Sequence, residues 1–341
     1  MASYPVTVYR SDDLGAPQLV NGTISSFFDV LQKCLVEGYG TKAPLGWTRS
    51  FYDPVTFKAA WRNDVANGGS GGSVYFESLT NNDVNQTSIA HSSCKSITTE
   101  GVITGRGRSP RIQMGSGSSA WVLIGTAIGF YFYSFATSGS NSFVNLSSTS
   151  SSLYRSAFYA GDIFSIIGSD AGKFVTISNL TSSSDNVVNT NSISLGYLNS
   201  VPNINFGYIS VWDADGADTF AGYGYSAMLT ATQDAAGGDA STSPLIYPKL
   251  FTPFLLKIPG NLNSSTTVDR DGLPVKISPT RPGIRGSLPG LFCTTFSFGF
   301  GQQLPLVITE SGVSYHTLPS ANTGAASCFV IQTGAWDDPF A

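Results

Sequence analysis

The longest stretch without charge constrains this chain more than any other feature of its sequence. No Asp, Glu, Lys or Arg occurs between Arg111 and Arg155, and the segment 120–137 is mostly apolar. Such a segment is close to the length that a helix needs to cross a bilayer. Two glycines interrupt it, however, and most of its other residues are aromatic or β-branched, which favours strands.

We interpret this segment as two strands, Trp121–Ile124 and Phe130–Ala136, joined through Thr126–Gly129. Because both faces of the strands are apolar, we expect the hairpin to be covered on both sides. The flanking loops are rich in Ser and Gly and lack the Lys/Arg clusters that orient membrane helices. A membrane span is therefore the weaker alternative, and none is predicted.

The composition favours a folded β protein. Only 12% of the 341 residues are charged, about half the usual share, whereas 41% are hydrophobic. Disordered chains show the opposite balance. Ser, Thr, Asn and Gly replace charge, as in strands joined by turns. With a net charge of -4 the chain has no broad electrostatic attraction for nucleic acid, which is not expected as a partner.

One helix is predicted near the N-terminus. Apolar residues recur with helical spacing along one face, namely Ile24, Phe27, Phe28, Leu31, Cys34 and Leu35. Thr23 or Ser25 can cap its start, and Gly38 suits its end. The predicted fold is therefore mainly β, a β-sandwich or β-barrel-like body, with one amphipathic helix over 24–37.

Short apolar segments elsewhere predict further strands. They are Thr56–Trp61, Ser73–Glu77, Ser96–Thr104, Ile163–Ile167, Lys173–Ser178, Asn205–Trp212, Ala221–Thr230, Leu304–Thr309 and Cys328–Gln332. The proline-rich region 243–290 is expected to run extended across a surface, because proline donates no hydrogen bond to a sheet. Two domains, 1–182 and 183–341, are one division of the chain, and a single domain is the other.

Two segments resemble catalytic or cofactor motifs but lie in the wrong context. Gly68–Gly72 matches the G-x-S-x-G pattern, yet a strand rather than a helix is predicted after it. Gly222–Ala227 resembles a dinucleotide-binding turn but lacks the surrounding strand–helix–strand unit. The four cysteines are widely spaced and only two histidines occur, which disfavours common zinc sites. No catalytic residue, cofactor or enzyme activity is predicted.

Three aspartates beside a tryptophan form the most prominent acidic cluster. Asp213, Asp215 and Asp218 follow Trp212 within six residues. Carboxylates at this spacing are weak candidates for calcium ligands, and the indole could stack on a sugar. The favoured alternative is an Asp-Gly hairpin turn that ends a strand.

Three arginines lie close together in a glycine-containing segment. Arg106, Arg108 and Arg111 lack interleaved aromatic residues. A solvated loop is the default interpretation. As a functional alternative, contact with an acidic patch of a protein partner is favoured over contact with phosphate.

The N-terminal residues lack the basic and apolar regions of a signal peptide. We therefore expect synthesis in a cytoplasm, where the thiols stay reduced.

Four stretches together resemble a family of virion structural proteins of tailed bacteriophages. They are Val8–Asp13 with Gly15–Pro17, Cys34–Gly40 with Gly46–Thr48, Tyr159–Ile163, and Ile284–Leu291. The resemblance implies a homo-oligomer that assembles with other virion proteins in the host cytoplasm and is carried on the virion. It implies no catalytic residues.

Within a particle, a tail, baseplate or neck position is the leading expectation. A capsid-surface decoration protein is an alternative, and so is a module that binds host-surface glycan through Trp212 and the aspartates beside it. A glycan-cleaving enzyme would need two carboxylates at a controlled separation, and no such pair stands out in the sequence.

Overall fold

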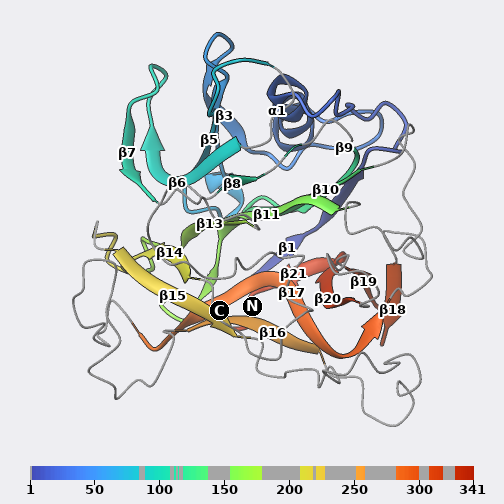
Figure 1. Ribbon diagram of the computed structural model, residues 1–341. Coiled ribbons are helices and arrows are strands. Elements are labelled where there is room, and N and C mark those ends of the chain that lie inside the picture. The colour runs from blue at the N-terminus through green and yellow to red at the C-terminus, as the bar shows by residue number, and fades with distance from the viewer. Residues whose placement is uncertain are drawn as a thin grey trace, which may run out of the picture.

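A computed structural model of the chain describes most of the predicted elements (Figure 1). The described residues are 2–83, 89–107, 111–112, 114, 118–136, 154–178, 208–217, 220–226, 251–257, 282–298, 307–317 and 327–341. The mainly β fold is confirmed, with several antiparallel sheets and one helical segment near the N-terminus. None of the described helices has the length and hydropathy of a membrane-spanning segment.

A five-stranded sheet forms the middle layer of the molecule. Its strands, in spatial order, are β13 (Phe174–Ser178), β11 (Tyr154–Asp162), β10 (Gly129–Ala136), β9 (Ser118–Gly125) and β2 (Thr7–Arg10). All neighbouring strands are antiparallel.

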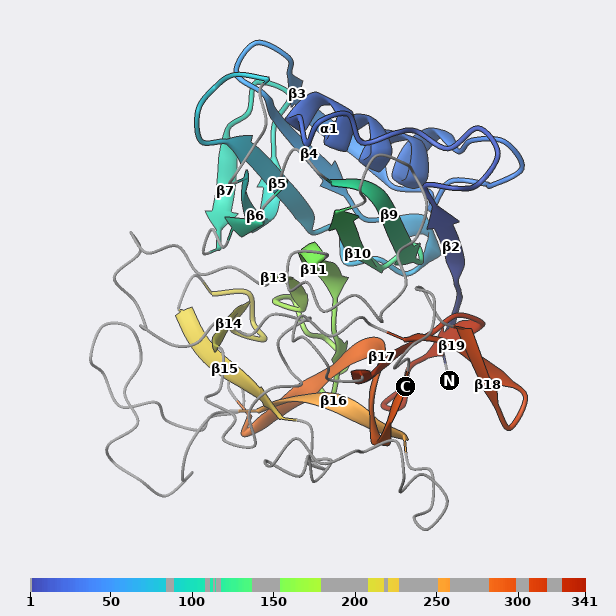
Figure 2. The same ribbon diagram turned by 45° about the vertical axis from the view of Figure 1, so that its right-hand side comes forward.

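A six-stranded sheet and the helix form the upper layer in Figure 2. The sheet holds β3 (Thr48–Asp53), β4 (Lys58–Arg62), β5 (Ser73–Ser78), β6 (Ile89–Ile97) and β7 (Ile103–Arg106), with β8 (Arg111–Ile112) on β6. The helix α1 (Ile24–Gln32) continues as a π-helical turn, η1 (Lys33–Glu37). A short 3-10 helix, η2 (Val65–Asn67), precedes the loop that leads into β5.

An eight-stranded sheet forms the lower layer (Figure 2). In order, it contains β14 (Tyr208–Trp212), β15 (Phe220–Ser226), β16 (Phe251–Lys257), β17 (Ile284–Phe298), β20 (Ser327–Gln332), β19 (Val313–Thr317) and β18 (Val307–Glu310), with β12 (Phe164–Ser165) on β17. The chain ends meet where β1 (Ser3–Pro5) pairs with β21 (Ala335–Asp337).

The central hairpin β9–β10 is buried on both faces, as its sequence predicts. Phe130 and Phe132 point to the upper core, whereas Tyr131 and Tyr133 point to the lower core. Successive strand residues face opposite sides of a sheet, so alternating Phe and Tyr serve two different interfaces. The turn closes with a hydrogen bond from the Thr126 amide to the carbonyl of Gly129, at 2.8 Å.

Tyr131 and Tyr133 face the lower sheet, where each hydroxyl has a hydrogen-bond partner. Tyr131 donates to the carbonyl of Pro289 in β17 at 2.8 Å, and the Tyr133 hydroxyl lies 3.3 Å from Nδ1 of His316 in β19. A buried hydroxyl without a partner is costly, so tyrosine suits this interface and phenylalanine suits the upper one, where the neighbouring side chains are mostly apolar.

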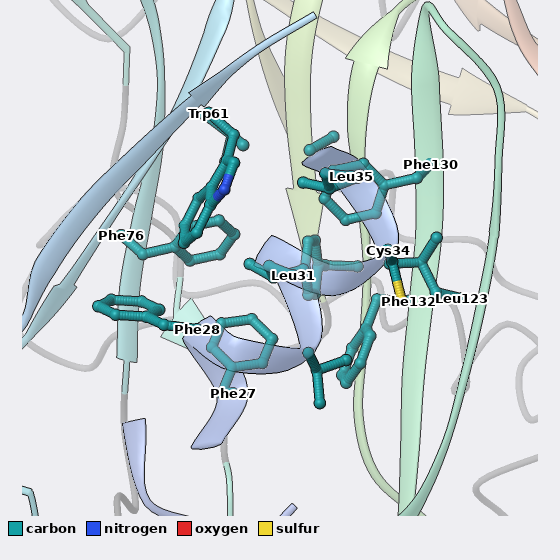
Figure 3. Packing of buried hydrophobic residues seen from close by; sticks show 14 of the residues in the cluster. Phe27, Phe28, Leu31, Cys34, Leu35, Trp61, Phe76, Leu123, Phe130 and Phe132 are labelled. Atoms are coloured by element: carbon teal, nitrogen blue, oxygen red, sulfur yellow. The ribbon is translucent and has the colours of Figure 1, made fainter. Parts of the chain in front are cut away.

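Helix α1 fills the space between the upper and central sheets (Figure 3). The ring of Phe27 lies edge-on to Phe76 of the upper sheet and Phe132 of the central sheet, each at 5.3 Å between centroids. Neither predicted cap residue caps the helix with its own side chain. Instead Asp83, from the loop after β5, accepts a 2.9 Å hydrogen bond from the amide of Ser25.

The strand predicted over Ser96–Thr104 is wrong, because this segment holds a turn between two strands. β6 ends at Ile97, β7 begins at Ile103, and these two residues pair. Gly101 adopts a φ of 81°, which a hairpin turn requires, and its amide bonds to the carbonyl of Thr98.

The surface path predicted for the proline-rich region is also wrong where the structure describes it. Strands β16 and β17 pair inside the lower sheet, and Phe254 and Leu256 are buried. Pro253 is tolerated because the register shifts directly after it, at a β-bulge where no ladder donor is needed.

Several strands escape sequence reasoning, among them β2, β3, β11 and β17. The remaining predicted strands appear with shifted ends, and residues 205–207, 227–230 and 304–306 lie outside the described part. The predicted domain boundary near 182 also lies outside it. Residues on both sides of that boundary share one core, in which Tyr131 and Tyr159 pack with Leu288 and Ile331.

Candidate functional site

Asp213 and Asp215 of the acidic cluster lie between β14 and β15. Trp212 pairs with Phe220, so the alternative of a hairpin turn is confirmed. Asp213 is buried and Asp215 is exposed, and Asp215 accepts a hydrogen bond from the Ala217 amide at 2.9 Å. The outward carboxylate therefore stabilises its own turn.

Asp218 lies outside the described residues. Among the residues that the structure describes, no group of three acidic, His or Cys side chains is arranged to hold a metal ion.

The Trp212 indole is already occupied on one face. Lys95 of the upper sheet places Nζ 4.8 Å from the ring centroid and donates to the carbonyl of Gly216. A lysine in this position makes a cation–π contact. A sugar that stacked on this face would have to displace the lysine.

Arg106 lies on the outer face of the upper sheet and is engaged within it. Its Nε donates to Ser92 at 3.1 Å, its NH2 group pairs with Glu77, and its guanidinium lies over the ring of Tyr75. Its side chain remains 37% exposed, so it can still meet a partner at its rim.

The other two arginine candidates are not brought beside Arg106. Arg108 lies outside the described residues. The backbone of Arg111 pairs with Ala90 in β8, and its side chain is not described. A three-arginine contact surface therefore stays a prediction.

A buried ion pair that sequence reasoning missed joins β17 to the segment between β12 and β13. Arg285 in β17 and Asp170 after β12 are both fully buried, with Nε–Oδ2 at 2.6 Å and NH2–Oδ1 at 2.7 Å. The guanidinium also donates to the carbonyl of Trp212, while Asp170 accepts from the Gly172 amide and the Ser165 hydroxyl. Such satisfied, bidentate pairing is what a buried charge requires.

A second buried carboxylate holds the glycine-rich loop. Asp162 at the end of β11 accepts hydrogen bonds from the Ser70 amide at 2.7 Å and the Ser70 hydroxyl at 2.5 Å. Burial raises the pKa of Asp162, and Lys173, with Nζ 3.6 Å from Oδ2, opposes that rise. The serine of the G-x-S-x-G motif thus binds a carboxylate and precedes a strand. It lacks the strand–turn–helix setting of a nucleophile.

A third network joins residues 10–13 to residues 39–42. The Tyr39 hydroxyl donates to Asp13 at 2.9 Å, and Asp13 also accepts from the Arg10 amide. Lys42 lies 3.8 Å from the same carboxylate. Desolvation by burial raises the pKa of Tyr39, which therefore stays a neutral donor.

These three polar networks share one feature. The polar groups with the most partners among the described residues connect strands and loops that lie far apart in the sequence. No family model matches this chain, and comparison with curated proteins finds no similar sequence. The sequence signals for these networks were weak, since a lone arginine or aspartate gives no indication of its partner.

Proposed function

We propose that this chain is a structural component of a tailed bacteriophage particle, in the tail, baseplate or neck, and acts through subunit–subunit contacts. One observation carries the proposal. Each of the four stretches that resemble the virion family contains a residue whose side chain forms a hydrogen bond or ion pair with a distant part of the fold.

These contacts are of different types, but each connects separate segments of the chain. Asp13 binds Tyr39 from the second stretch, and Trp47 of that same stretch donates to the carbonyl of Thr126 at 3.1 Å. Asp162 of the third stretch anchors the glycine-rich loop, and Arg285 of the fourth forms the buried ion pair. Sequence motifs whose residues stabilise the fold favour a protein with a structural role.

The proposal is tested on particles from the organism that carries the gene. An antibody against the full-length recombinant chain is applied to purified particles, and bound antibody is located by gold labelling and electron microscopy. Antibody pre-absorbed with the recombinant chain serves as the control. Label on the tail, baseplate or neck is expected.

Two results would change the conclusion. Label over the capsid lattice would replace the tail position with capsid decoration. Absence of label, together with absence of the chain from the mass spectrum of the particles, would overturn the virion assignment.

Glycan recognition is a separate outcome, tested with a glycan array. Binding that is lost in Asp215→Ala and Trp212→Ala but kept in Asp53→Ala would assign a recognition role instead. Asp53 is a matched control because it also stabilises its own turn, by accepting from the amide of Val55.

A further inference from the structure

The chain has two histidines, and the fold buries one at each face of the central sheet. His91, in β6, lies between the upper and central sheets, whereas His316, in β19, lies between the lower and central sheets. Both are shielded from water, with exposed fractions of 0% and 4%.

His91 lies among aromatic rings. Its imidazole is 5.8 Å from the ring of Phe76 in the upper sheet and 5.4 Å from the ring of Phe158 in the central sheet, between centroids. Neither ring nitrogen has a hydrogen-bond partner among the described residues. A neutral imidazole tolerates this setting far better than a cation, which would need a counter-charge or water.

In the part of the chain that the structure describes, no charged group hydrogen-bonds to the His91 imidazole. Charged residues on the elements packed around it are Asp29, Glu77, Lys95, Arg106, Arg111, Arg155 and Asp162. Glu77 is paired with Arg106, and Asp162 is held by Ser70 and Lys173. Burial is the cause that lowers the pKa of His91, to about 3.

His316 is held in a similar setting on the other face. Its Nδ1 lies 3.3 Å from the Tyr133 hydroxyl of the central sheet. Burial and, to a smaller extent, the positive charge of Arg10 in β2 together lower the pKa of His316 to about 4. Glu310, in the neighbouring strand β18, lies opposite Val313 at the turn of the hairpin, whereas His316 lies opposite Val307 at its other end.

We propose that the two histidines form an acid-sensitive device, in which protonation destabilises both faces of the central sheet and separates the layers. The proposal goes beyond a structural role in the virion and does not depend on it.

The sign of the effect follows from linkage. A histidine whose pKa is lower in the folded chain than its usual 6.5 binds protons more readily when unfolded. Stability is therefore intact above pH 6.5 and is lost as the pH falls from there toward 4 and 3. At pH 5 each histidine raises the unfolding equilibrium constant by roughly 30-fold relative to pH 7.5.

The test compares urea unfolding of the full chain at pH 7.5 and pH 5. We expect the unfolding constant of the wild type to rise by about three orders of magnitude between these pH values. His91→Phe and His316→Gln should each remove about 30-fold of that rise. The double variant contains no histidine, so its remaining pH dependence reports the carboxylates, Asp162 included.

A second measurement needs no variant. Histidine-selective NMR labelling gives one signal set for each of the two imidazoles, and neither should titrate above pH 5 in the folded chain. Titration of either imidazole near pH 6.5 would overturn the proposal for that histidine. An undiminished pH dependence in the double variant would overturn the device as a whole.

Discussion

Removal of the Arg285 guanidinium should destabilise the protein strongly. Arg285→Met keeps most of the side-chain volume but leaves the Asp170 carboxylate buried without its counter-charge. It also removes the donor to the Trp212 carbonyl. Because the Asp170 carboxylate is buried, water cannot replace the lost ion pair.

The expected magnitude follows from the burial of both partners. Breaking a buried ion pair by removing one partner costs about 3–5 kcal/mol. Replacing both partners, as in Arg285→Met with Asp170→Leu, removes the stranded charge. Because no charge is stranded, the double variant should cost less than the sum of the single variants by about 2–3 kcal/mol. A cost remains, because the Gly172 amide and the Trp212 carbonyl still lose their partners.

Urea denaturation of the four proteins at pH 7.5 measures this double-mutant cycle. Lys33→Met is a control, because it breaks the exposed pair with Glu37 on the surface of the helix and should have a much smaller effect. The reasoning is refuted if Arg285→Met costs no more than Lys33→Met. It is also refuted if the costs of the two single variants simply add.

Three further substitutions test the packing of the layers by the same assay. Tyr131→Phe should cost about 1–3 kcal/mol because the Pro289 carbonyl loses its donor, and an unchanged midpoint would contradict that bond. Phe27→Ala should cost about 3–5 kcal/mol, and a loss below about 1 kcal/mol would show that the helix is not wedged between the sheets. Gly286→Ala should lower the melting temperature sharply, since the new methyl would meet the Phe164 carbonyl at a φ of 156°; retained stability would argue against that β12–β17 pairing.

The elements that local patterns predict are those whose signal lies within a few residues. The helix follows from the spacing of Ile24, Phe27 and Leu31, and the central hairpin follows from two apolar strands around a glycine-bounded turn. The turn after Trp212 belongs to the same class, because an Asp-Gly pair closes it locally.

Predictions fail where one segment contains two opposing signals. The prolines of β16 and β17 argue against a sheet, yet a register shift after Pro253 accommodates one of them. Ile97 and Ile103 favour a strand through their segment, yet Thr98 and Gly101 between them form the turn between β6 and β7.

By itself the sequence determined the β class, the helix near the N-terminus and a hairpin that needs cover on two faces, because periodicity and turn residues act over short distances. Tertiary structure alone decided what covers that hairpin and which polar groups meet. Asp170 and Arg285 lie 115 residues apart and Ser70 and Asp162 lie 92 apart, and no local pattern pairs them. The interiors of the two interfaces, with one histidine in each, exist only once three sheets have stacked.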